Sequence, residues 1–194
     1  MFKGNIVTLR ELRLKDVYTF KNWSKHTSQL FLDYNFYEIE KEDIEKWYTW
    51  KTSSPFSIYY VILKEEKPVG YISFKNISNI FKCASLGIVL NPACMDRGYG
   101  TDALKTMLKY YFNDLNFKKI NLKVASYNKR AINLYSKIGF VKKRTTLMPF
   151  PNGDFDINNE DFSGNKDCFK KFFGKTFFYA FNMDITREDF ENEV

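Results

Sequence analysis

A loop rich in glycine and charge, Met95-Asp-Arg-Gly-Tyr-Gly-Thr101, separates a strand-like run from a helical pattern. Gly98 and Gly100 carry no Cβ, so a diphosphate could approach their backbone amides closely. The first amides of a helix have no partner within the helix, and the helix dipole favours negative charge there. Arg97 adds a cation at the same point. These residue types indicate a phosphate site, although a G-x-G alone is more often a turn that uses glycine only for its geometry.

Two common phosphate motifs do not fit this loop. The Walker pattern needs Lys-Ser/Thr after its second glycine, and the chain has no such sequence. The stretch Gly98–Ala103 matches the dinucleotide pattern G-x-G-x-x-A, but that pattern also requires an early βαβ unit and an acidic residue about 20 positions later. Residues 115–153 contain no Asp or Glu. A dinucleotide-binding fold is therefore excluded.

A second segment with chemical potential is Asn128-Lys-Arg-Ala-Ile-Asn-Leu-Tyr-Ser-Lys-Ile-Gly-Phe140. Its apolar residues recur at helical spacing, and Gly139 stands where a helix commonly ends in the left-handed conformation. Considered alone, Tyr135 would be an aromatic residue on the core face of this helix.

The two segments together resemble the GCN5-related N-acetyltransferases (GNAT), and among them the branch of the ribosomal-protein N-acetyltransferases. The first is similar to the family's acetyl-CoA pyrophosphate loop, R/Q-x-x-G-x-G/A. The second is similar to N-x-x-A-x-x-L-Y-x-K-x-G-F nearly position by position. The match covers about residues 5–147 and the closing strand. It implies an α+β fold with a mixed central β-sheet, an antiparallel N-terminal meander and flanking helices.

The resemblance also implies roles for individual residues. Tyr135 would be the catalytic acid that protonates the departing thiolate. Lys137, with Lys129 and Arg130, would reach the adenosine phosphates, and Met95 belongs to the cofactor loop. The backbone of a strand would hold the pantetheine arm, at Ile88, Val89 and Leu90. The loop would bind the pyrophosphate through Arg97, Gly98, Tyr99, Gly100 and Thr101. Asn128 would contact the pantetheine, and the small side chain of Ala131 would leave room for the cofactor.

The chain departs from the family pattern at two positions. Met95 stands where Arg or Gln is usual, which removes one polar contact to the cofactor. Ser85 stands where many relatives carry a glutamate, and serine is a poor base, so the proton of the amine would leave through water or through a carboxylate from a loop. Residues 148–175 form a long insertion that is either a disordered polar loop or an acidic cap over the acceptor, with these carboxylates: Asp154, Asp156, Glu160 and Asp161.

The remaining pattern predicts the elements that position these segments in one domain, 1–194. A strand with Ile6, Leu9 and Leu12 comes first, and no internal repeat is found. Helices are expected at about Lys15–Lys25, from near Glu40, from Gly100 to Leu115 and from Ala131 to Ile138. Further strands are expected at Ile58–Leu63, Val69–Phe74, Ala84–Leu90, Ile120–Val124, Phe140–Leu147 and Thr176–Ile185.

The composition narrows the class of protein. The 194 residues include 20 Phe, 13 Tyr and 3 Trp, which is ample for a packed core. No apolar run approaches the ~20 residues of a membrane span, and the N-terminus shows no apolar signal region. One histidine, His26, in a polar stretch expected to be helical and at the surface, argues against a histidine triad or a metal site. Three cysteines without paired spacing point to a reduced, cytoplasmic protein.

The net charge of +7 is concentrated in residues 115–153, which hold nine basic and no acidic residues. This predicts an anionic partner near that segment, although a solvated basic surface would look the same. The family resemblance implies an acetyl-CoA-dependent N-acetyltransferase without a metal, acting on a primary amine of a protein N-terminus, polyamine, amino sugar or antibiotic. The alternatives are a non-catalytic RNA- or ribosome-binding module, supported by Tyr127, Tyr135 and Phe140, and an acetyl-CoA sensor. Homodimer formation stays open; membrane and nucleic-acid partners are not expected.

Overall fold

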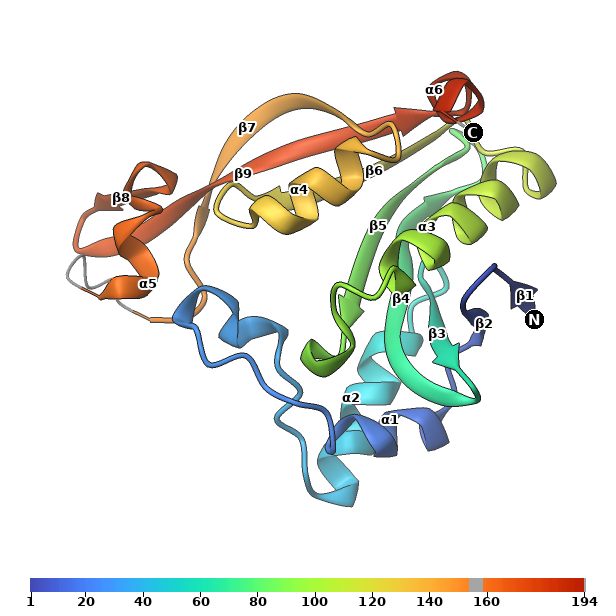
Figure 1. The fold of residues 1–194 in the computed structure, drawn as a ribbon, viewed down its shortest axis with the longest axis horizontal. Coiled ribbons are helices and arrows are strands. Elements are labelled where there is room, and N and C mark those ends of the chain that lie inside the picture. Colours follow the sequence, from blue (N-terminus) through green and yellow to red (C-terminus); the bar gives the residue numbers. More distant parts are fainter. Residues whose placement is uncertain (154–158, 194) are drawn as a thin grey trace. The chain divides into compact units, whose positions relative to one another are not determined.

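The computed structural model describes residues 1–153 and 159–193, which form two compact units (Figure 1). The N-terminal unit comprises residues 1–25 and 36–120. The C-terminal unit comprises residues 26–35 and the chain from residue 121 onward. The segment 26–35 thus leaves its sequence neighbours and packs with residues that follow it by about a hundred positions. That the chain acts as a single domain stays a prediction.

The N-terminal unit contains the expected antiparallel meander, with strands paired in chain order. The strands are β1 (Phe2–Lys3), β2 (Thr8–Glu11), β3 (Ile58–Lys64), β4 (Lys67–Ser78) and β5 (Cys83–Leu90). The helices are α1 (Leu14–Phe20), α2 (Lys41–Thr52), the short 3₁₀ helix η2 (Pro92–Cys94), α3 (Tyr99–Lys109) and the π-helical turn η3 (Tyr110–Asp114).

Alternation along β3 explains why this sheet is covered on both faces. Tyr59, Val61 and Leu63 pack with Phe20 of α1 and Ile44 of α2. Those two helices lie side by side (Figure 1). The intervening Tyr60 faces the other way and meets Phe74, whose ring stacks on Tyr111 at 3.7 Å between centroids. Because successive side chains of a strand point to opposite faces, a continuous apolar run needs helices on both sides.

Helix boundaries differ from the sequence expectation at several points. The helix expected at Ala131–Ile138 spans Lys129–Ser136, two residues earlier at each end. The helix expected at Lys15–Lys25 ends at Phe20, where the amides of Asn22 and Trp23 turn back to the carbonyls three residues earlier. Trp23 still covers the predicted apolar face, since its ring stacks on Phe20 at 4.0 Å. The helix expected to reach Leu115 widens at Tyr110 into η3, with the Leu115 amide bonded to the Tyr110 carbonyl five residues back.

The start of the chain also differs from prediction. The expected strand containing Ile6, Leu9 and Leu12 is limited to β2, and Ile6 is 43% exposed in the turn before it. A short additional strand, β1, pairs with β2. Leu9 and Leu12 are buried, as their spacing predicted, whereas Ile6 belongs to the turn between β1 and β2.

The C-terminal unit is built around β9 (Lys175–Thr186), which pairs with β6 (Lys119–Ala125), β7 (Val141–Pro149) and β8 (Phe169–Phe172). β6 begins at the boundary between the units. The other elements are η1 (Gln29–Tyr34), α4 (Lys129–Ser136), α5 (Glu160–Ser163), η4 (Lys166–Cys168) and α6 (Arg187–Glu193). Its core is aromatic, with Tyr127, Phe150, Phe162 and Phe178 buried together.

The expected long insertion at 148–175 is largely part of this unit. β7 continues to Pro149, and β8 forms a hairpin with the closing strand, which begins at Lys175. Phe162 of α5 is fully buried and packs against Phe150. The described part of this segment is therefore not a disordered loop, because its aromatic residues complete the core. The acidic cap over the acceptor stays a prediction.

None of the helices in residues 1–153 and 159–193 is long and apolar enough to cross a bilayer. The three cysteines are free thiols: Cys83 and Cys94 are half-buried, and Cys168 is buried in the aromatic core of the C-terminal unit. Within the same residues there is no cluster of three or more potential metal ligands.

Candidate active site

The turn into α3 has the geometry that an anion site requires. Gly98 is the N-cap of the helix and has φ +78°, a left-handed conformation that glycine adopts without strain. Its carbonyl accepts the amide of Asp102 at 3.0 Å, so helix geometry leaves the amides of Tyr99, Gly100 and Thr101 outside the intrahelical ladder. The glycine N-cap has no side chain to occupy them. These amides can therefore serve a bound phosphate.

The residues just before this turn are exposed or half-buried. Met95 follows η2 and is half-buried, whereas Asp96 and Arg97 are exposed. Asp96 also has a positive φ, +58°, so the chain turns twice through the left-handed region before α3 begins. This puts Arg97 beside the helix N-terminus, together with the exposed carboxylate of Asp96.

The end of β5 is held tightly to β4. Leu90, Val89 and Ile88 lie opposite Gly70, Tyr71 and Ile72, respectively. A Cβ on Gly70 would approach the Val89 carbonyl oxygen to 2.6 Å, so glycine is needed for this close pairing. The strand expected to hold the pantetheine arm is thereby fixed along one edge.

Farther back on β5, Ser85 lies opposite Lys75 and accepts a long hydrogen bond, 3.4 Å, from the side chain of Asn76. Burial lowers the pKa of Lys75. At the position where the family resemblance implies a glutamate, the chain thus has a hydroxyl in polar surroundings and not a base.

In the C-terminal unit, Asn128 begins the helix that carries the second motif. Its side-chain oxygen accepts the amide of Ala131 at 3.1 Å, which caps α4. The side chain is only 8% exposed, and its amide group also interacts with the hydroxyl of Tyr34. Asn128 thus has a structural role in addition to the cofactor contact that the motif implied. Ala131 is half-buried on the first turn of α4.

Tyr135 lies in the last turn of α4 and is 7% exposed, beside Phe140. Burial raises the pKa of its phenol, and the neighbouring Tyr34 raises that pKa further. Since a phenol ordinarily titrates near ~10, the group is protonated throughout the neutral range. This is the protonation state that a general acid needs.

Tyr34 was missed as a site residue by the sequence analysis. It comes from η1, in a segment about a hundred positions before α4, yet it interacts with both Asn128 and Tyr135. Burial and the nearby Asp33 raise the pKa of Tyr34. The aromatic richness of residues 30–37 was the one available signal, and it did not single out this tyrosine.

The basic residues of the second motif lie at the surface, at both ends of α4. Lys129, Arg130 and Lys137 are all exposed, and Lys137 follows the last turn of α4, at the opposite end from Asn128. His26, expected at a helical surface, instead lies half-buried in a loop beside Phe31. Burial lowers its pKa, and the charge of Arg130 lowers it further, so His26 is neutral at pH 7.

The aromatic residues cited for nucleic-acid binding are core residues. Tyr127, Tyr135 and Phe140 are 5%, 7% and 3% exposed. Rings buried to this extent cannot stack on bases, which removes the aromatic part of that alternative.

Of the four carboxylates expected over the acceptor, the structure describes two, Glu160 and Asp161. Asp161 accepts the amide of Gln29 at 2.8 Å and thereby anchors η1, while Glu160 is exposed. Asp154 and Asp156 lie outside the described residues.

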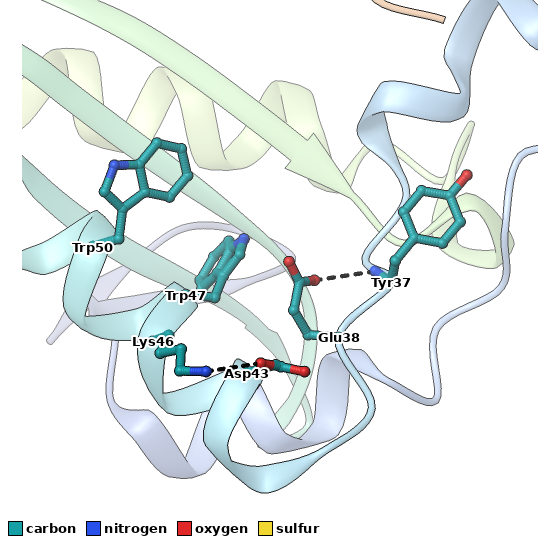
Figure 2. Close-up of a pocket in the computed structure, with 6 residues that line it drawn as sticks. All are labelled: Tyr37, Glu38, Asp43, Lys46, Trp47 and Trp50. Carbon is teal, nitrogen blue, oxygen red and sulfur yellow. Dashed lines mark hydrogen bonds and ion pairs between the residues drawn. The ribbon is translucent and has the colours of Figure 1, made fainter.

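A surface pocket of about 490 Å³ opens on α2 and the segment before it (Figure 2). Its walls are aromatic and charged: Tyr37, Glu38, Asp43, Lys46, Trp47 and Trp50. Trp50 is 70% exposed, and Lys46 is paired with Asp43 at 3.3 Å. Lysine ammonium groups already lie against the rings, with Lys51 over Trp50 at 4.1 Å and Lys25 over Tyr37 at 4.8 Å. The rings and the carboxylates of Glu38 and Asp43 attract an organic cation, whereas the positive charges of these three lysines oppose one.

The fold and the α3 turn define an acetyltransferase-type domain, and comparison with known proteins identifies the family. The model of the acetyltransferase (GNAT) domain matches residues 7–141, so the chain belongs to the GNAT family. The spermidine N-acetyltransferase of Vibrio cholerae in complex with CoA and spermine has the same fold, with a TM-score of 0.71 at 21% identity over 97% of this chain and 100% of that one. A dodecameric structure of the Vibrio cholerae enzyme gives a TM-score of 0.66 at 19% identity, over 97% and 98%.

Sequence similarity to curated relatives is confined to part of the chain. Spermidine N(1)-acetyltransferase of Escherichia coli K12 is 30% identical over 81 residues, which is 42% of this chain and 44% of that protein. The matched region thus spans less than half the length of that relative. The family expectation is confirmed, whereas assignment to the ribosomal-protein branch stays a prediction.

The cap of α4 can be tested separately from ligand binding. Replacing Asn128 by Ala should lower the free energy of unfolding by about 1 kcal/mol, because the Ala131 amide loses its acceptor. Asn128→Ser should cost less, since serine is also a good N-cap. Urea unfolding of the three proteins measures the difference, and equal losses for both variants would contradict the capping role.

Proposed function

We propose that this protein is an acetyl-CoA-dependent N-acetyltransferase that acetylates a primary amine by direct transfer. The observation that carries the proposal is the left-handed glycine N-cap of α3, which leaves amides for a diphosphate in a chain of the GNAT family. The residues present fit the substrate: a helix N-terminus, an exposed Arg97, a fixed strand edge and a buried neutral phenol.

In this reaction the amine nitrogen attacks the carbonyl carbon of the thioester, and the carbon–sulfur bond breaks as the amide forms. Backbone amides stabilise the negative charge that develops on the carbonyl oxygen. Tyr135 donates its proton to the departing sulfur. The proton lost from the amine leaves through water or a loop carboxylate, since Ser85 is no base.

The cofactor residues are proposed as follows. The β5 backbone at Ile88–Leu90 holds the pantetheine, the α3 turn from Arg97 to Thr101 binds the pyrophosphate, and Asn128 contributes its amide group. Met95 adds no charge to this set. Lys137 is proposed to attract the adenosine phosphates from its exposed place after α4. Homodimer formation stays a prediction; a dodecamer is recorded for the Vibrio cholerae relative.

For the acceptor we propose a cationic alkylamine such as a polyamine, rather than an amino sugar, an antibiotic or a protein N-terminus. Two observations support this choice. The curated relatives act on spermidine, and the pocket on α2 combines indole rings with Glu38 and Asp43 (Figure 2). Exposed rings attract ammonium groups by about 0.5–1 kcal/mol. Glu38 adds to that attraction, whereas Asp43 is already paired with Lys46.

Gly100→Asp should abolish the binding of acetyl-CoA while the fold survives. Gly100 is buried in the first turn of α3, and the change adds a side chain and a negative charge beside the amides. Thermal unfolding with and without CoA is the measurement, because a ligand that binds the native state raises Tm. If the variant gains the same stabilisation from CoA as the parent protein, the loop is not the pyrophosphate site.

Tyr135→Phe should reduce kcat by ~10²–10⁴-fold and leave the affinity for acetyl-CoA nearly unchanged, because packing is kept and the proton is lost. A loss of only a few-fold, with chemistry shown to limit the rate, would remove Tyr135 as the acid. In the parent, the raised pKa of Tyr135 keeps the acid protonated in alkaline solution. The rate should therefore rise with pH as the amine loses its proton and should not fall again by about pH 10.

The proposed acceptor class is tested by thiol release across a panel of polyamines, amino sugars, aminoglycosides and peptides. Turnover on any of them rules out a pure sensor or a nucleic-acid-binding module. Trp50→Ala should raise KM for polyamines by ~2–5-fold without changing KM for acetyl-CoA. Phe81→Ala is the matched control, since Phe81 is 77% exposed and does not line the pocket. Equal effects of the two changes would exclude the pocket as an amine site.

A further inference from the structure

Asp102, in the first turn of α3, is a buried carboxylate that the site described above does not use. It is 9% exposed, and its oxygens accept three consecutive backbone amides from the start of the chain. The distances are 3.0 Å from Asn5, 2.7 Å from Ile6 and 2.9 Å from Val7. A carboxylate that accepts three amides makes strong, charge-assisted hydrogen bonds.

The turn that supplies these amides is shaped to fit the carboxylate. Gly4 closes the turn by donating its amide to the Val7 carbonyl at 2.9 Å. A Cβ on Gly4 would overlap the carboxylate of Asp102 and would come within 2.8 Å of Thr106 Oγ1. Only glycine therefore allows the turn to approach α3 this closely.

The same turn also reaches the N-cap of α3. A Cβ on Gly98 would lie 3.3 Å from Ile6 Cδ1, so Ile6 packs directly against the left-handed residue that opens the helix. This contact explains why Ile6, although apolar, stands outside β2. Residues 4–7 thus hold α3 at two points, its N-cap and its first turn.

The hydrogen bonds of Asp102 also reduce a repulsion between its charge and that of a bound diphosphate. A carboxylate in the first turn of a helix interacts favourably with the helix dipole, but it would repel a diphosphate bound at the same turn. Here both oxygens of Asp102 are directed to the amides of residues 5–7, which hold them in place and neutralise part of their charge.

We infer that Asp102 is a positioning residue: through the turn at residues 4–7 it fixes the geometry of the α3 N-terminus for diphosphate binding. This inference rests on the proposed function. It assigns residues 4–7, which belong to neither motif, to the support of the cofactor loop.

The test measures the affinity for CoA of Asp102→Asn by calorimetry, together with KM for acetyl-CoA and kcat. An Asn side chain of the same size places an NH₂ group against amide donors, so at least one hydrogen bond is lost. We expect Kd for CoA and KM for acetyl-CoA to rise about tenfold, with kcat changed less than twofold, because the reacting groups are untouched.

Asp16→Asn is the matched control. Asp16 is also buried in the first turn of a helix of the same unit, where it accepts the Arg13 amide at 2.9 Å and pairs with Arg10 at 2.6 Å. Its loss should lower stability and leave Kd for CoA unchanged. Gly4→Ala displaces the turn from the other side and should therefore weaken CoA binding as Asp102→Asn does. It tests the same inference if Asp102→Asn does not fold.

Amide hydrogen exchange without ligand provides a second readout. Exchange should accelerate at residues 5–7 and 99–101 in Asp102→Asn but not in Asp16→Asn. If the parent binds CoA and a folded Asp102→Asn or Gly4→Ala binds it equally well, the positioning role is overturned while the proposed function stands. If the parent itself does not bind CoA, the proposed function fails, and the inference fails with it.

Discussion

Backbone amides at the start of α3 impose the constraint on which the site depends. They must stay outside the helical ladder, yet they lie in a turn whose Gly100 is buried. Unpaired buried amides are costly unless a ligand or solvent satisfies them. The chain meets this constraint with a glycine N-cap, which cannot fill the position with its own side chain. A second glycine, Gly70, holds β5 against β4, so the strand leading to the turn is equally fixed.

The sheet of the N-terminal unit holds the segment that follows this turn in place. Because β3 is apolar on both faces, α1 and α2 cover one face, while Tyr111 of η3 packs against the other. The stack of Phe74 on Tyr111 ties the end of the α3 segment to the sheet, whereas the turn at residues 4–7 ties its beginning. The helix is therefore anchored at both ends, and its N-terminus has little freedom to shift when an anion binds.

In the C-terminal unit, burial controls chemistry as well as packing. Tyr135 has few solvent contacts, so its phenol keeps its proton. The same desolvation acts on Tyr34 and Tyr127, whose pKa values are also raised. The buried tyrosines of this region therefore keep their protons, whereas the neutral imidazole of His26 is in the form that accepts a proton.

The sequence by itself determined the family, the order of most elements and the residues of both motifs, because glycine spacing and apolar periodicity are local properties of the chain. The helix of the second motif was predicted in this way, but α4 ends at Ser136, and Gly139, with φ +103°, lies in the turn that follows. Tertiary structure alone decided which distant residues meet these motifs. In the sequence, Asp102 looks like an ordinary residue of a helix. Only the fold brings to it the amides of residues 5–7, which lie about 95 positions earlier in the chain. Tyr34 likewise reaches Asn128 only because residues 26–35 pack with the C-terminal unit. Such contacts depend on how the chain closes long loops, which no short-range pattern encodes.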